Sequence, residues 1–412
     1  MIEYKKRTLS NGLTVIAHRD TSTPMAAVNV LYKVGARNER PERTGFAHLF
    51  EHLMFGGSIH VPDYDVHVQL AAGENNAFTN NDYTDYYLTL PKENIETALW
   101  LESDRMLQLA FNEKSLEVQR KVVVEEFNQR YLNQPYGDLW LLLRPLAYRA
   151  HPYRWPTIGA TPDHIRNVAM EDVKAFYERY YNPDNAILSV AADVECETIF
   201  ELAEKWFGGI PRGAAFSDDI PAEPQQTEAR RLEVVRPVPA TVIMIAFHTG
   251  ARTSQEFAVC DVVSDLLSNG NSSRMYQHLV KEKSLFSSVN AYVTGEMDPG
   301  LFVVTGTLLD EIAVETAEAA LWDELELLKT GEISDYELEK MQNKFESGVI
   351  FGEINVMNKA MNLGFYEMLG DVGLINREVD IHRSVTKEDV QAEAKSLFVP
   401  EKSSTLIYKR ES

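Results

Sequence analysis

The sequence predicts an α+β protein with two homologous domains, each a mainly antiparallel sheet packed with helices, joined by an extended linker. Three observations support this fold class. Strand-like and helical segments alternate along the 412 residues. Residues 24–37 resemble residues 239–252, and eleven positions separate the proline from the glycine in both copies. Between the copies, residues 211–230 are rich in proline and polar side chains, which is typical of a linker.

The first half begins with a predicted hairpin, because two alternating apolar runs, residues 5–9 and 13–17, flank the favoured turn Asn11-Gly12. A buried strand over residues 26–32 ends near Gly35. The later elements follow from apolar runs with periods of two or 3.6 residues. We expect helices at residues 46–55, 64–71, 94–109, 113–132, 137–147, 170–181 and 197–206, and strands at 76–79, 83–90 and 185–191.

The second copy follows the linker and has the same order. A strand precedes Gly250, and a helix begins at Phe257-Ala258, as the first copy's helix begins at Phe46-Ala47. Further on, we expect strands at residues 289–294, 301–307 and 404–408, and helices at 312–328 and 335–346. The predicted domains are therefore residues 1–210 and 231–412, with the linker at 211–230.

Composition excludes several functional classes. The chain has 62 acidic and 40 basic residues, a formal charge of −22, which disfavours binding to nucleic acid or anionic membranes. Two widely spaced cysteines, Cys196 and Cys260, make a disulfide framework or a cysteine zinc site unexpected. No apolar run approaches 18 residues, and the N-terminus lacks an apolar signal region. We expect a cytoplasmic protein, or an exported form if a leader was removed.

His48, Glu51 and His52 form an HxxEH motif in the helix predicted at residues 46–55. Histidines at i and i+4 project from one helix face and can bind a single ion. The spacing reverses the familiar HExxH arrangement and is the inverzincin signature. Two histidines one turn apart also occur by chance, and a catalytic zinc needs three protein ligands and an open position. A third ligand must therefore lie elsewhere in the chain.

The second copy lacks this motif. Aligning the two copies places Val259, Val262 and Val263 at the positions of the two histidines and the glutamate. Valine side chains cannot bind zinc. Only the first domain is expected to carry metal chemistry.

The helix predicted at residues 113–132 offers a candidate for the third ligand. Val118, Val122 and Glu126 share one face at i, i+4 and i+8, so Glu126 should end an inward stripe. A carboxylate that extends an apolar stripe is costly unless it is paired or bound to metal. Glu125 points about 100° away around the helix. A solvated pair of glutamates is the alternative that spacing leaves open.

These features resemble the pitrilysin/insulinase family of zinc peptidases, in its short branch that includes mitochondrial processing peptidases. The resemblance begins with HxxEH followed, about 75 residues later, by a helical glutamate. Other motifs support it along most of the chain: Asn11-Gly12-Leu13, Gly35-Ala36-Arg37, Asn76-Ala77-Phe78-Thr79, residues 120–126, His151-Pro152-Tyr153, residues 181–185 and residues 270–274.

The resemblance implies that Glu126 is the third ligand and that one zinc ion binds per chain through His48, His52 and Glu126. It implies that Glu51 is the general base, which takes a proton from water and passes it to the leaving amine. The expected activity is that of a zinc metalloendopeptidase.

The resemblance also implies how a substrate binds. An extended peptide is expected to add to an edge strand at Asn76, Ala77 and Phe78 by main-chain hydrogen bonds. Unfolded or short peptides would then be cleaved inside a clamshell chamber. The rival interpretation is a non-catalytic structural or peptide-binding subunit of a larger complex.

Two departures from the family pattern bear on partners. Gln119 stands seven residues before the third ligand, where the family usually has a glutamate. Val280 and Ser287 stand where family chains that act alone carry an arginine and a tyrosine. The resemblance therefore implies a heterodimer with a homologous subunit that carries the Arg/Tyr pair. The competing interpretation is a homodimer in which Arg274 or Tyr276 substitutes for the pair.

Overall fold

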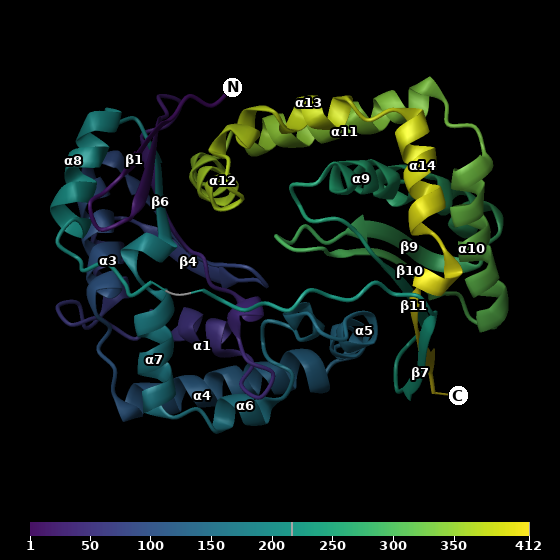
Figure 1. Cartoon of the computed structure of the whole chain (residues 1–412), viewed down its shortest axis with the longest axis horizontal. Helices are drawn as coiled ribbons and strands as arrows, with labels where there is room; N and C mark the ends of the chain where they lie inside the picture. The colour runs from purple at the N-terminus through teal and green to yellow at the C-terminus, as the bar shows by residue number, and fades with distance from the viewer. Residues whose placement is uncertain (216, 412) are drawn as a thin grey trace. The chain divides into compact units, whose positions relative to one another are not determined.

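The computed structural model describes residues 1–215 and 217–411, and the chain forms two compact units (Figure 1). The first unit comprises Met1–Asn128, Trp155–Ile220 and Ile350–Arg377, and the second comprises Gln129–Arg154, Pro221–Val349 and Glu378–Ser412. The predicted α+β class is confirmed, since each unit contains one sheet with helices. The units are discontinuous in sequence, whereas the predicted domains were continuous, and the predicted linker is divided between them.

The first unit contains a six-stranded sheet in the order β1-β2-β6-β3-β5-β4. Only the pair β2–β6 is parallel. The predicted hairpin is present, with Thr8 opposite Thr14 around the Asn11-Gly12 turn. The strands are β1 (Lys5–Thr8), β2 (Thr14–Arg19), β3 (Met25–Tyr32), β4 (Glu74–Thr79), β5 (Thr84–Pro91) and β6 (Ala186–Ala192).

Helices cover both faces of this sheet. Successive side chains of a strand point to opposite faces of the sheet, and paired residues share a face. Asn29 of β3 pairs with Tyr87, whereas Tyr86 of β5 pairs with Val30, so Asn29 and Tyr86 point to opposite faces. Asn29 lies against Gly364 of α12, and the Tyr86 hydroxyl donates a hydrogen bond to the Phe50 carbonyl of α1. The main helices of this unit are α1 (Phe46–Leu53), α2 (Tyr64–Leu70), α3 (Ile95–Leu107), α4 (Glu113–Phe127), α6 (Pro162–Arg166), α7 (Met170–Tyr180), α8 (Cys196–Phe207) and α12 (Val356–Met368).

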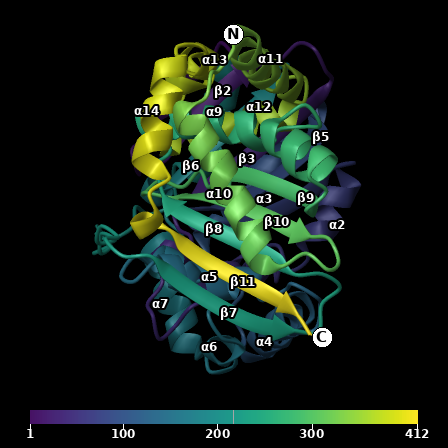
Figure 2. The same cartoon turned by 90° about the vertical axis from the view of Figure 1, so that its right-hand side faces the viewer.

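The second unit contains a five-stranded sheet in the order β7-β11-β8-β10-β9 (Figure 2). Its one parallel pair, β7–β11, corresponds in position to β2–β6 of the first sheet, which supports the predicted duplication. The strands are β7 (Arg230–Arg236), β8 (Val242–His248), β9 (Phe286–Val293), β10 (Leu301–Leu308) and β11 (Ser404–Arg410). The main helices are α5 (Leu139–Ala147), α9 (Gln255–Ser268), α10 (Val314–Thr330), α11 (Asp335–Gly352), α13 (Glu378–Arg383) and α14 (Lys387–Leu397).

One helix from each half of the sequence packs on the sheet formed by the other half. Helix α5 contacts β7, β8 and β11, and α12 contacts β3 and β6. The apolar pattern did not predict α12. This exchange explains why the compact units are discontinuous. None of the helices in the described residues combines the length and apolar character that crossing a membrane requires.

Candidate metal centre

Helix α1 carries HxxEH and buries its opposite face. Phe46, Ala47, Leu49, Phe50 and Leu53 are buried, as their periodicity predicts. The two histidines and the glutamate stay partly exposed. The helix therefore holds three polar side chains at the surface of a packed core.

The start of α1 depends on a residue outside the motif. Gly45 precedes the helix with φ of 88°, a backbone conformation that favours glycine. Glycine has no side chain to cap the helix. Instead, the side-chain oxygens of the buried Glu39 accept hydrogen bonds from the backbone N–H groups of Gly45, at 2.8 Å, and Ala47, at 2.9 Å. Burial raises the pKa of Glu39 to about 8, although these N–H groups act to lower it.

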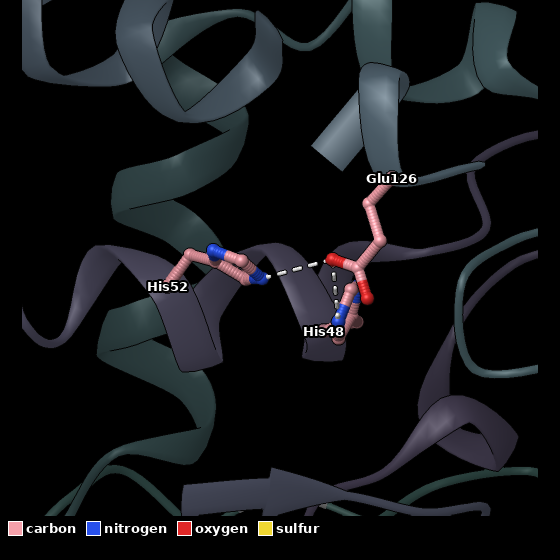
Figure 3. Close-up of side chains that lie close together, drawn as sticks. All are labelled: His48, His52 and Glu126. Atoms are coloured by element: carbon pink, nitrogen blue, oxygen red, sulfur yellow. Dashed lines mark ion pairs between the residues drawn. The ribbon is translucent and has the colours of Figure 1, made fainter. Parts of the chain in front are cut away.

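Three side chains converge at the exposed face of α1 (Figure 3). Nε2 of His48 lies 3.7 Å from Oε2 of Glu126, and Nε2 of His52 lies 3.4 Å from the same oxygen. The donor atoms all lie within 4.8 Å of one another. Among residues 1–215 and 217–411, these three form the one group of His, Cys, Asp or Glu side chains with the spacing of a metal site.

The donor set fits zinc. Two imidazole nitrogens and one carboxylate oxygen are a ligand set of catalytic zinc sites, which keep a further position open for water. The exposed side-chain fractions are 12% for His48, 24% for His52 and 19% for Glu126, so solvent reaches the group. These residues could hold one zinc ion accessible to substrate.

Helix α4 supplies Glu126, but the predicted stripe on this helix was wrong. Val118 and Val122 are 49% and 44% exposed. The core-facing residues are Leu116, Val123 and Phe127, because α4 packs through that face on α1 and α6. Glu126 lies beside this stripe and reaches the histidines, whereas Glu125 is exposed and outside the group.

Glu51 lies on α1 between the two histidines and does not belong to the donor group. Its Oε2 accepts a hydrogen bond of 2.6 Å from the Thr79 hydroxyl. Sequence reasoning assigned no role to Thr79 or to Glu39. The Thr79–Glu51 contact joins residues 28 positions apart, and the Glu39 contacts join residues six and eight positions apart. The only sequence signal was the position of Thr79 at the end of the Asn76-to-Thr79 motif.

The predicted substrate segment lies on β4, the last strand of the first sheet, which pairs with β5 alone among the described strands. Asn76 is exposed, Ala77 is buried, and the half-buried Phe78 ring lies 5.5 Å from that of Tyr83. The backbone N–H of Ala77 donates to Oδ1 of its neighbour Asn76, at 2.8 Å. Helix α1 packs against β4, so the edge strand and the donor group share one surface region.

In the second unit, valines occupy the positions of the first unit's motif, as expected. Val259, Val262 and Val263 are buried in the core on α9. Val280, on the helical segment η6 (Tyr276–Glu282), packs against the same core. The Ser287 hydroxyl donates to the Thr307 carbonyl on β10, at 3.2 Å.

Arg274 and Tyr276, the proposed substitutes, lie in the same unit. The Arg274 guanidinium forms a 3.0 Å ion pair with Glu337 and donates to the Glu332 carbonyl. Burial raises the pKa of Glu337, but the hydrogen bonds from Arg274 and Ser334 outweigh it, so the pKa falls to about 2. The pair therefore stays ionised at neutral pH.

Comparisons with known proteins cover most of the chain. Residues 14–159 match a family model described as "Insulinase (Peptidase family M16)", and residues 167–345 match one described as "Peptidase M16 inactive domain". The chain is 32% identical over 346 residues to the zinc protease PqqE of Helicobacter pylori, covering 82% of this chain and 78% of that protein.

Two further relatives cover nearly the whole chain. An uncharacterized zinc protease of Bacillus subtilis, YmxG, is 24% identical and covers 98% of each chain. The crystal structure of a protease from Helicobacter pylori matches with a TM-score of 0.94 and 29% identity, covering 99% of this chain and 100% of that one.

Proposed function

This chain belongs to the insulinase family of peptidases, family M16, and from that premise we propose that it is a zinc-dependent endopeptidase. The observation that carries the proposal is the convergence of the donor atoms of His48, His52 and Glu126 within 4.8 Å. Glu51 projects beside this group from the same helix without belonging to it. The names of the relatives as zinc proteases support the same chemistry.

In this proposal, three residues bind the metal and a fourth transfers protons. Nε2 of His48, Nε2 of His52 and Oε2 of Glu126 would hold one zinc ion. A bound zinc supplies Lewis acidity, which favours deprotonation of water and polarises the scissile carbonyl. Glu51 acts as the general base and then as the proton donor to the leaving amine. It lies between the two histidines in sequence, and its carboxylate is not one of the proposed ligands.

We propose that the substrate is an unfolded or short peptide. Strand β4 offers one backbone edge that no described strand pairs with, and an extended peptide can add to such an edge by main-chain hydrogen bonds. Asn76, Ala77 and Phe78 would contact it. The peptide would have to displace the Asn76 side chain from the Ala77 N–H. A folded substrate has no extended strand to offer, so we expect folded proteins to be cleaved far more slowly than unfolded or short peptides.

The proposal is tested by Glu51→Gln. The variant should keep its zinc, because the three donor atoms are unchanged, and it should lose at least ~10²-fold of peptide hydrolysis, the usual contribution of a general base. Zinc content by elemental analysis and the cleavage rate of an unfolded peptide are the two measurements. Wild-type activity should also disappear with a chelator and return with zinc. Unchanged turnover in Glu51→Gln would assign proton transfer to another group.

We further propose that this chain works as the metal-bearing subunit of a heterodimer. The support is chemical: valine and serine cannot supply a cation or a phenol, and a proteolytic site needs donors that stabilise the developing oxyanion. Arg274 is committed to its ion pair with Glu337, which makes it a poor substitute within a homodimer. The partner would be a similar chain that carries the arginine and tyrosine and lacks HxxEH.

A second candidate function is a peptide-binding or structural subunit with no turnover. The same replacements, Val280 and Ser287, favour it. It predicts zinc binding without hydrolysis, even with a companion chain present. Measuring metal content and hydrolysis on the same sample separates the two functions.

A further inference from the structure

The hydrogen bond between Thr79 and Glu51 joins the edge strand to the proposed base. Thr79 is the last residue of β4, and its Oγ1 donates to Oε2 of Glu51 at 2.6 Å. A short bond from a neutral donor to a carboxylate is among the stronger hydrogen bonds in proteins. We propose that Thr79 is a positioning residue, which sets the orientation of the Glu51 carboxylate for proton transfer. The inference rests on the proposed function, because it assigns Glu51 as the base.

The hydroxyl of Thr79 is held by the backbone around it. Thr79 pairs with Thr84 in the β4–β5 ladder. The turn that follows is closed by its own bonds, since Oδ1 of Asn80 accepts from the N–H groups of Asp82 and Tyr83 at 2.8 and 2.9 Å. A β-branched side chain on a strand has few χ1 choices. The position of this donor is therefore set before any substrate arrives.

The same turn is fastened to the segment that leads into α1. The Ala36 N–H donates to the Asn80 carbonyl at 3.1 Å, and the Arg37 N–H donates to the Asn81 carbonyl at 2.8 Å. The approach is so close that a Cβ at Gly35 would lie 2.5 Å from the Asn81 backbone. Two residues later, Glu39 caps α1. The strand that carries the Thr79 hydroxyl and the helix that carries the Glu51 carboxylate are therefore joined by hydrogen bonds through residues 36–39.

The chemical consequence concerns the carboxylate plane. The terminal torsion of a glutamate is broad and roughly two-fold, so an unrestrained carboxylate samples many orientations. The Thr79 hydroxyl selects one of them by engaging Oε2. A general base must lie within hydrogen-bond reach of the proton that it takes, so fixing its plane raises the productive fraction. Because Thr79 ends the docking strand, the same residue aligns the base with a peptide added to β4.

The test uses two substitutions at one position. Thr79→Val removes the hydroxyl and keeps the shape, and Thr79→Ser keeps the hydroxyl. We expect Thr79→Val to lower kcat by about tenfold or more, since misplacing a reacting group by 1 Å can cost about 10²-fold. KM and zinc content should not change, because the hydroxyl contacts neither ligand donors nor the main-chain edge. Thr79→Ser should recover most of kcat.

A matched control variant and a second set of variants in the Glu51→Gln background distinguish a positioning role of Thr79 from a structural one. Thr89→Val introduces the same change on β5, at a threonine whose hydroxyl makes no hydrogen bond with any described residue, and should leave kcat unchanged. In the Glu51→Gln background, Thr79→Val should have no further effect on hydrolysis, because the group that it orients is already lost. A merely structural threonine would lower activity in both backgrounds.

Three outcomes would overturn the inference. These are an unchanged kcat in Thr79→Val, an equal loss in Thr79→Ser, or a loss that follows zinc content. Each leaves the proposed function standing, since wild-type activity and its loss in Glu51→Gln are measured independently. If the wild type hydrolysed peptides without zinc, or if Glu51→Gln hydrolysed them at the wild-type rate, the proposed function would be overturned and the inference with it.

Discussion

Among individual residues, Glu126 decides whether the metal group has three donors or two. Its Oε2 is the atom on which both imidazoles converge, at 3.7 and 3.4 Å. Glu125, its neighbour in sequence, is exposed on another face of α4. A third ligand distinguishes a catalytic zinc site from a pair of surface histidines. The two adjacent glutamates therefore allow a direct comparison, because only Glu126 belongs to the donor group.

Glu126→Gln should lose most of its bound zinc, because an amide oxygen is neutral and a poorer zinc ligand than a carboxylate. Glu125→Gln should keep full occupancy and serves as the matched control. The measurement is zinc per chain after dialysis against metal-free buffer. Zinc retained in Glu126→Gln but lost in Glu125→Gln would mean that the wrong glutamate has been assigned.

Among secondary-structure elements, α1 depends on a cap from outside the helix. The first N–H groups of a helix have no partner within it, and Gly45 offers no side chain. The side-chain oxygens of Glu39 cap the helix instead, by accepting hydrogen bonds from the N–H groups of Gly45 and Ala47. Because His48 lies in the first turn, the cap also sets the position of a proposed metal ligand.

Glu39→Gln should therefore destabilise the protein by about 1–3 kcal/mol, because an amide N–H₂ would face a buried backbone N–H that has lost its acceptor. Urea unfolding measured with a chelator present gives the change without a contribution from bound metal. Glu93→Gln, a change of the same kind at an exposed glutamate, is the control. Equal unfolding midpoints for wild type and Glu39→Gln would contradict the capping role.

The same residue predicts a pH dependence. Burial raises the pKa of Glu39 from its ordinary value of 4.5 to about 8. A carboxyl whose pKa is raised on folding contributes stability that is fully present below the unfolded value and is lost as pH rises through the folded value. The stability advantage of wild type over Glu39→Gln should therefore shrink between pH 5 and pH 9. An advantage that grows over this range would contradict the shift.

At the scale of the whole molecule, the five strands of the second sheet follow the same order as β2-β6-β3-β5-β4 of the first, which has β1 in addition, but the corresponding helices carry different side chains. Each sheet has one parallel pair and ends in an edge strand, β4 in the first unit and β9 in the second. The first unit carries the donor group on α1 and α4, whereas α9 of the second carries buried valines. Val280 and Ser287 supply neither a cation nor a phenol, and the proposed heterodimer rests on that difference.

We expect the isolated chain to hydrolyse peptides weakly and a companion chain with the arginine and tyrosine to raise the rate by about 10²-fold or more. The measurement is peptide cleavage by the purified chain alone and with candidate companions. Val280→Arg with Ser287→Tyr should raise the activity of the isolated chain, and Ser287→Tyr alone tests the exposed position without disturbing the core. Full activity of the isolated chain, unchanged by the double variant, would refute the heterodimer.

The local sequence pattern was sufficient to predict many of the structural elements of this protein. Asn11-Gly12 predicted the first hairpin, and the apolar residues at helical spacing around HxxEH predicted the helix. The repeated Pro-to-Gly segment predicted the duplication. Each depends on residues close in sequence, where helix and strand periods leave a direct record. The pairing of Glu126 with HxxEH came from family resemblance, and the structure brings these residues together.

Other features exist only in the folded chain. The face of α4 that packs inward, the exchange of α5 and α12, and the Thr79 bond to Glu51 all join segments distant in sequence. The Glu39 cap spans only six and eight residues, but it depends on a side-chain contact that no helix or strand period describes. On α4, valines appear on both the buried and the exposed face, so hydrophobicity alone selected the wrong stripe. Which face is buried depends on the neighbouring helices, and which donor meets a carboxylate depends on how strand and helix pack. Periodicity records neither of these, because it describes one segment at a time.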